Sequence, residues 1–227
     1  MKLKKIASLM LAGVMAVSML AGCSGKGNGN DGEPENPVVP TTGVVAYAND
    51  SLSADSKEEF SYTASTELDA ILKDLASNTG DFSKETISSI YKNTNIVYGV
   101  ASGNVAKKLN DKLGGLVDGD FSKAPINGIS DHYGYVYAIS GRLSEKEAVA
   151  KIASNFAEGY VLNTSDDNSY GIKCPETVKY NDDNYDCAYS AEISAVKVSN
   201  SSASNESAWV VAIVLTQNIT KASNTVD

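Results

Sequence analysis

The sequence has very few of the residues on which most enzymatic sites depend. It contains one histidine, His132, and one arginine, Arg142, in 227 residues. A single histidine excludes a multi-histidine zinc site and leaves one Ser-His-Asp arrangement possible. Asp131 is not placed to orient His132, because neighbouring residues of a strand point to opposite faces. The sequence therefore indicates no catalytic residue and no cofactor, and it favours a protein that is not an enzyme.

Clusters of positive charge are also missing beyond the first five residues. Lysine and arginine number 19 against 28 acidic residues, which gives a net charge of -9. Nucleic acids and anionic lipid headgroups are bound through clustered Lys and Arg side chains. The sequence therefore predicts no nucleic-acid ligand and no charge-driven contact with a membrane.

Two acidic stretches, residues 165–171 and 181–186, offer oxygen ligands of the kind that calcium prefers. An EF-hand loop starting at Asp166 would need an acid or amide at its fifth position and a glutamate at its twelfth. The chain has Tyr170 and Thr177 there. Because Asp and Asn in polar runs form turns with their own backbone, no metal site is predicted.

The most apolar stretch lies at the N-terminus. Lys2, Lys4 and Lys5 form a positive region, and residues 6–20 form an apolar segment with small residues interspersed. This layout is typical of a secretory signal peptide and is shorter than the ~20 residues that span a membrane. The segment ends in Leu20-Ala21-Gly22-Cys23, where an ordinary signal would end in an Ala-x-Ala-like site.

This ending resembles the lipobox of bacterial lipoproteins, in which the cysteine thiol is alkylated with diacylglycerol and the chain is cut just before it. The resemblance covers residues 1–23 and implies a signal peptide over 1–22. It also implies a mature chain anchored by lipid at Cys23 on the extracytoplasmic side of the cell membrane. Two acyl chains anchor firmly, since each buried methylene contributes ~0.8 kcal/mol. Removing the signal peptide takes away three lysines and no acidic residue, so the net charge changes from -9 to -12.

Residues 23–59 are predicted to be the lipidated cysteine and a flexible tether. The stretch is rich in Gly and Asn and holds three of the chain's five prolines. Such composition cannot bury enough apolar surface to offset the entropy of ordering it. Within it, the short run 44–48 is compatible with a strand that docks on the domain. We expect a single globular domain over residues 60–227.

Four segments of this domain have the apolar periodicity of helices. The last has the strongest signals, because Ser144 and Glu147 have capping-box spacing. Ser83 is placed to cap the second segment, and Gly114 is placed to end the third. The four segments are residues 66–77, 81–93, 104–115 and 143–160.

Three segments have the patterns of strands. Residues 131–140 and 189–198 alternate between apolar and polar side chains, whereas residues 208–217 are apolar almost throughout. A continuous apolar run suits a central strand that is covered on both faces. A polar stretch joins the last two segments. These elements predict an α+β domain, with about four helices packed on a small, mainly antiparallel sheet that ends in a C-terminal hairpin.

Cys174 and Cys187 remain once the lipidated Cys23 is set aside, and they enclose twelve residues. In an exported domain such a pair predicts a disulfide bond. The bond would contribute about 3 kcal/mol in the chain-entropy model. Two alternatives stay open: a catalytic thiol, which would need a base nearby, and two reduced thiols in an envelope without a strong oxidase.

Tyr133, Tyr135 and Tyr137 share one face of the first predicted strand. Because tyrosine combines a large apolar face with a polar tip, the three rings would suit an exposed platform for a glycan or peptide. The same stripe is also typical of the core side of a sheet. The tyrosines are therefore candidate binding residues with a structural alternative.

Taken together, these patterns favour a noncatalytic surface module that binds an envelope protein, peptide or glycan, or serves envelope structure. The alternative is a cell-wall-associated enzyme, since the helix at 144–154 and the C-terminal hairpin resemble the end of secreted CAP/SCP-type domains. That family's paired histidines and acids are absent from this sequence, so no residue role is carried over. A solute-binding lipoprotein would need repeated βα units, which the chain does not contain.

Overall fold

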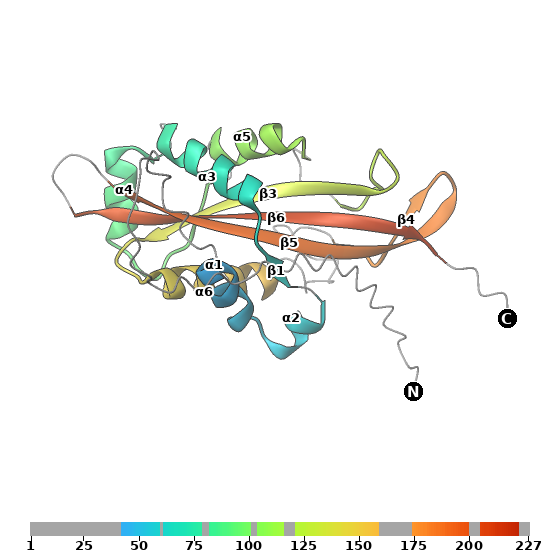
Figure 1. Ribbon diagram of the computed structural model, residues 1–227, viewed down its shortest axis with the longest axis horizontal. Coiled ribbons are helices and arrows are strands. Elements are labelled where there is room, and N and C mark those ends of the chain that lie inside the picture. Colours follow the sequence, from blue (N-terminus) through green and yellow to red (C-terminus); the bar gives the residue numbers. More distant parts are fainter. Residues whose placement is uncertain are drawn as a thin grey trace, which may run out of the picture. The chain divides into compact units, whose positions relative to one another are not determined.

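A six-stranded sheet forms the centre of the folded chain (Figure 1). The computed structural model describes residues 42–59, 61–78, 82–100, 104–115, 121–158, 174–199 and 205–222. The predicted signal peptide and Cys23 lie outside these ranges. In chain order the elements are α1 (Thr42–Asp50), α2 (Ala54–Glu59), β1 (Tyr62–Thr63), α3 (Thr66–Asn78), α4 (Lys84–Tyr91), β2 (Tyr98–Gly99), α5 (Asn104–Leu113), β3 (Ser130–Ser140), α6 (Glu145–Phe156), β4 (Thr177–Tyr180), β5 (Asp183–Ser199) and β6 (Ser207–Lys221).

The strands follow the order β1-β5-β6-β3-β2, and β4 pairs with β5. All pairs are antiparallel except β1 with β5, so the sheet is mainly antiparallel as predicted. β5 and β6 form the predicted hairpin, with Ser199 opposite Ser207. β6 lies between β5 and β3 along most of its length, which explains why its sequence is apolar almost throughout.

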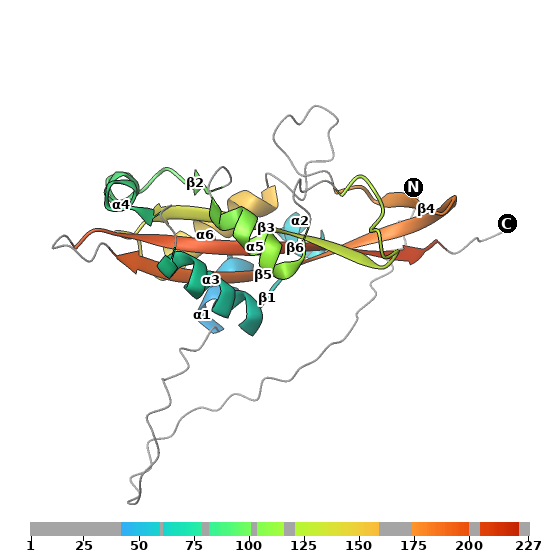
Figure 2. The same cartoon turned by 90° about the horizontal axis from the view of Figure 1, so that it is seen from above.

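Helices cover both faces of the sheet. In the orientation of Figure 1, α3 and α5 lie above it, α1 and α6 lie below it, and α4 stands at its left end, where Ile90 packs against Ala138 and Ala208. Figure 2 shows the same layers from above, with α3 beside the β5 edge. Even-numbered residues of β6 pack toward the upper helices and odd-numbered residues toward the lower ones. The upper set is Val210, Ala212 and Val214, and the lower set is Val211, Ile213 and Leu215.

The four predicted helices are present as α3, α4, α5 and α6, with the predicted end signals. The Ser144 hydroxyl accepts a hydrogen bond from the backbone N–H of Glu147, whose carboxylate accepts one from the backbone N–H of Ser144. The Ser83 hydroxyl accepts a bond from the N–H of Thr86. Gly114, with φ of 69°, ends α5 in the left-handed conformation that glycine adopts without strain. The predicted α+β class is therefore confirmed, and the described residues contain two helices beyond the expected four.

Helices α1 and α2 correct the prediction of a tether over residues 23–59. Val44, Ala48 and Leu52 are buried among the residues of α6 and the lower face of the sheet. Val44 and Ala48 are four apart on one face of α1, and Leu52 follows just after the helix, so the run 44–48 is not the strand considered above. The described residues, from 42 onward, belong to one compact unit. The folded domain therefore begins by about residue 42 and not at residue 60.

Candidate functional site

The three candidate binding tyrosines lie on the lower face of β3, where they pack with the end of α6. The ring centroids of Tyr133 and Tyr135 are 4.6 Å apart. Phe156 lies 5.4 Å from Tyr135 and 6.4 Å from Tyr137. Each tyrosine is half-buried against the lower core. This packing matches the core-side interpretation of the stripe, and it leaves only part of each ring accessible to a ligand.

Cys174 and Cys187 are brought together beside the β4–β5 hairpin, and both are free thiols. The backbone N–H of Cys187 donates to the carbonyl of Glu176 at 2.8 Å. Burial, assisted by the nearby charge of a Cys187 thiolate, raises the pKa of Cys174 to about 12. Burial also raises the pKa of Cys187, although hydrogen bonds with Tyr189 and Gln217 act in the opposite direction. A catalytic cysteine needs a lowered pKa, so this environment argues against a catalytic thiol.

We expect Cys174 and Cys187 to be joined by a disulfide bond in the exported protein, because the hairpin already holds them close together. Protein taken from cell membranes, denatured and alkylated without reductant should gain no alkyl group by intact mass. The Cys174→Ser variant is the control, since its Cys187 should then be alkylated. Two alkylated thiols in the unreduced native protein would refute the bond.

His132 lies on the upper face of β3, where it holds the end of α5. Its ring Nε2–H donates to the carbonyl of Leu113 at 2.7 Å, which satisfies one of the last carbonyls of the helix. The Asp131 carboxylate accepts from the backbone N–H of His132 at 2.9 Å and not from the ring. Asp131 therefore does not orient the imidazole, as strand alternation predicts.

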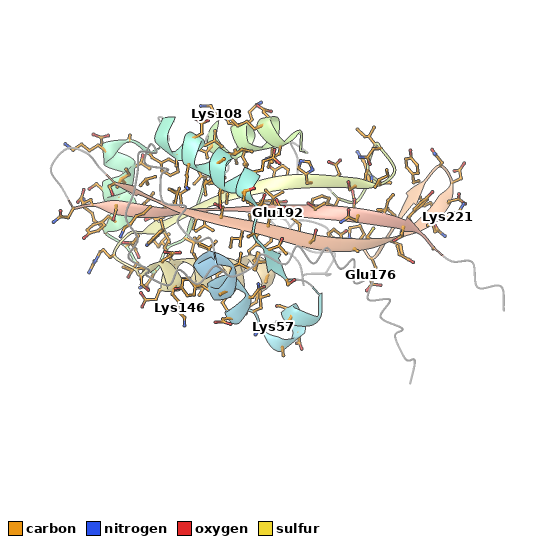
Figure 3. The ribbon with its side chains drawn as sticks, in the orientation of Figure 1. Lys57, Lys108, Lys146, Glu176, Glu192 and Lys221 are labelled. Atoms are coloured by element: carbon orange, nitrogen blue, oxygen red, sulfur yellow. The ribbon has the colours of Figure 1, made fainter. Side chains whose placement is uncertain are left out.

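The hydroxyl groups nearest His132 in the sheet do not complete a catalytic arrangement. Thr216 lies directly opposite His132, and Ser190 lies opposite Thr216 on the next strand. Two strand spacings put Ser190 about 10 Å from His132, which is too far for a hydrogen bond. Glu192 lies near the start of α3 (Figure 3), where burial raises its pKa and a hydrogen bond from Ser65 partly opposes that rise. The region is a polar face of the sheet and not a Ser-His-Asp site.

The acidic stretch at 181–186 forms the turn between β4 and β5 and the first four residues of β5. Asn181 and Asp182 have φ of 49° and 68°, the left-handed values that a tight hairpin turn requires. Lys221 donates to Asp183 beside that turn. In the described part of the chain no three His, Cys, Asp or Glu side chains are grouped as metal ligands. The other acidic stretch, 165–171, lies outside the described residues.

The outer edge of β3 is closed by groups of the chain itself. Asn110 is buried in α5, and its amide bonds both backbone groups of Gly134, with the Oδ1 atom 2.5 Å from the Gly134 nitrogen and Nδ2 3.0 Å from its oxygen. Further along, the N–H of Val100 donates to the carbonyl of Val136. Two side chains accept from further N–H groups of this edge: Asn127 from that of Ser130, and Asp131 from that of His132.

The opposite edge of the sheet, on β5, is open at its C-terminal end. The outward bond from Cys187 to Glu176 and the pairing of Ala191 with β1 show that odd-numbered residues of β5 direct their backbone groups away from β6. Ala195, Lys197 and Ser199 continue this series beyond β1. No described residue bonds their outward N–H and C=O groups. An edge of this kind is a template for pairing with another strand.

A groove of about 310 Å³ lies along this open edge. Its walls are the side chains of Ala76 from α3 and of Phe82 and Ile87 from the start of α4. Residues 196–199 of β5 form the rest of the lining. The Lys197 ammonium lies 5.2 Å from the centroid of the Trp209 ring. We call this feature the edge groove, and it is the candidate binding site of the described domain.

Comparison with known proteins identifies no relative. No family model, no curated protein and no solved structure matches the chain. Function is therefore inferred from the residues and from the geometry of the edge groove.

Proposed function

We propose that the chain is a lipid-anchored protein of a bacterial cell envelope, and that its domain binds a partner without catalysing a reaction. The anchor is supported by the coincidence of a positive region, an apolar segment and Leu20-Ala21-Gly22-Cys23 at the N-terminus. A doubly acylated Cys23 would hold the domain at the extracytoplasmic surface of the membrane.

In the described ranges, no helix has the length and apolar character needed to cross a membrane.

The noncatalytic role is supported by the contacts of the histidine and cysteine side chains, which are the candidates for acid–base or nucleophilic catalysis. His132 donates to the end of α5, and Cys174 and Cys187 have raised pKa values. The observation that carries the binding role is the edge groove, where an open strand edge and a hollow lie together. Of the partner classes that the sequence leaves open, which are an envelope protein, a peptide and a glycan, a peptide segment suits a strand edge best.

Replacing Cys23 with alanine should release the protein from the membrane fraction, because the variant lacks the sulfur that carries the lipid. Incorporation of a labelled fatty acid should be lost in the same variant. Ser24→Ala is the matched control, since it keeps the thiol and should stay labelled and membrane-bound. The anchor is disproved if the wild-type protein takes up no labelled fatty acid and Cys23→Ala still sediments with membranes.

A further inference from the structure

We propose that the edge groove binds an extended peptide segment of a partner protein as an additional strand beside β5. The segment would carry an acidic residue opposite Lys197, with an apolar residue on each side of it. This inference rests on the proposed function, since it names the class of partner that the binding domain would take.

The backbone of β5 provides the first part of the binding energy. Ala195, Lys197 and Ser199 each direct one N–H and one C=O group outward, and an incoming strand would bond them. Main-chain bonds of this kind give strand addition its affinity. Asn110, Asn127 and Asp131 close the outer edge of β3, whereas no described residue closes this part of β5. The contrast between the two edges marks the β5 edge as the one open to a partner.

The hollow of the edge groove provides the second part of the binding energy. It also selects which side chains a bound segment can carry. Side chains of an added strand alternate between the two faces of the sheet. Residues next to the one opposite Lys197 would therefore point to the upper face, where Phe82 and Ile87 line the groove. A volume of about 310 Å³ is at the lower limit for a pocket that holds a whole small molecule. It is large enough for one or two side chains of a peptide, and Phe82 and Ile87 give it an apolar wall beside the polar strand edge.

Lys197 provides the charge that selects an acidic residue. Its side chain is exposed, and the Trp209 ring holds the ammonium group beside the edge by a cation–π contact. No carboxylate of the described residues pairs with it. A second copy of the chain would bring another Lys197 to the same edge, where like charges oppose pairing. An acidic partner strand is therefore favoured over a dimer.

The test uses a fluorescein-labelled peptide, Thr-Val-Glu-Val-Glu-Val-Thr, and the full-length protein in detergent micelles. The peptide sequence reads the same in both directions, so the direction of pairing need not be known. Fluorescence anisotropy should show saturable binding. A peptide with lysine in place of both glutamates should bind about fivefold more weakly, the size of one exposed ion pair. Lys197→Glu should reverse this preference.

Two further comparisons test the backbone pairing. Ala195→Pro removes an outward N–H at an edge position that tolerates proline, so binding should weaken by at least about tenfold. Ala195→Ser keeps that N–H and should bind normally. Peptides N-methylated at both glutamates or at all three valines need no protein variant. Since one set of peptide amides faces β5, one of the two methylated peptides should lose binding and the other should keep it.

Three results would overturn the proposal. The first is that the acidic peptide does not bind the wild-type protein. The second is that the acidic and basic peptides bind equally well, and the third is that the two methylated peptides bind equally well. Sedimentation tests whether a second copy of the chain occupies the edge. If the wild-type protein is a dimer and Ala195→Pro is a monomer, another chain pairs with β5, and the proposal of a peptide partner is refuted. Normal fatty-acid labelling at Cys23 alongside any of these results would leave the anchor in place and reject the added strand alone.

Discussion

Replacing Val211 with aspartate should unfold the domain. Val211 is fully buried in the middle of β6, where it faces α1 and α6 among the largest cluster of core residues. Tyr137 and Ala195 flank it on the neighbouring strands. No Lys, Arg or His of the described residues is buried, so none lies inside this cluster to pair with a carboxylate. An aspartate there would be a buried, unpaired charge.

The expected loss is several kcal/mol, a large part of the roughly 5–15 kcal/mol that stabilises a native domain. The Val211→Asp protein should lose its cooperative melting transition and aggregate or be degraded in cells, while lipidation of Cys23 should continue. Asn218→Asp is the matched control, because it places the same charge on an exposed position of the same strand. It should melt close to the wild-type temperature. A Val211→Asp protein with unchanged far-UV circular dichroism and melting temperature would show that β6 is not the central strand.

The position of β6 could be predicted because local sequence and tertiary environment agree there. A strand covered on both faces needs apolar side chains at every position, and residues 208–217 have this pattern. The ends of α4, α5 and α6 were predictable for a similar reason. Capping by Ser83 and Ser144 and the turn at Gly114 depend on residues only a few positions away.

The start of the domain was harder to predict, because composition changes gradually through residues 23–59. Helix α1 has only nine residues and is too short to be stable alone, so its structure depends on packing against α6 and β5. The short strands β1, β2 and β4 have the same dependence. They are strands because long neighbours pair with them, and two to four residues carry too little pattern to reveal this.

The edge groove shows what sequence patterns leave out about a binding site. Whether a strand lies at an edge depends on the order of strands in the sheet, which periodicity does not encode. The lysine within the apolar alternation of Val196, Lys197 and Val198 is one local signal, since edge strands often carry an exposed lysine. Phe82 and Ile87 form the opposite wall of the groove. They come from a distant part of the chain, and their local sequence does not indicate that they lie beside the edge of β5.

Replacing Asn110 with leucine should open the second edge of the sheet. The Asn110 amide donates to the carbonyls of Ala106 and Gly134 and accepts from the Gly134 N–H. Leucine has a similar size but bonds none of these groups, so it would leave both backbone groups of Gly134 buried and unpaired. At 1–3 kcal/mol for each unsatisfied group, the free energy of unfolding should fall by about 3 kcal/mol. Urea denaturation measures this loss, and hydrogen exchange at the Gly134 amide should accelerate in parallel.

Asn110→Asp separates the hydrogen bonds from the packing, because it keeps the shape of the side chain. Its carboxylate can still accept from the Gly134 N–H, but it would face the carbonyl oxygens of Ala106 and Gly134. Repulsion there, together with burial, should raise the pKa of the new carboxyl in the folded state above its unfolded value of ~3.9. The protonated form is then the one that folding favours. Relative to wild type, the stability of this variant should therefore be greatest below pH ~4 and should fall as pH rises through the folded-state pKa.

Asn110→Leu is the control. Its loss of stability relative to wild type should be the same at pH 4 and pH 7. A deficit of Asn110→Asp that also stays constant with pH would show that Asn110 fills space at the β3 edge and does not close it by hydrogen bonding.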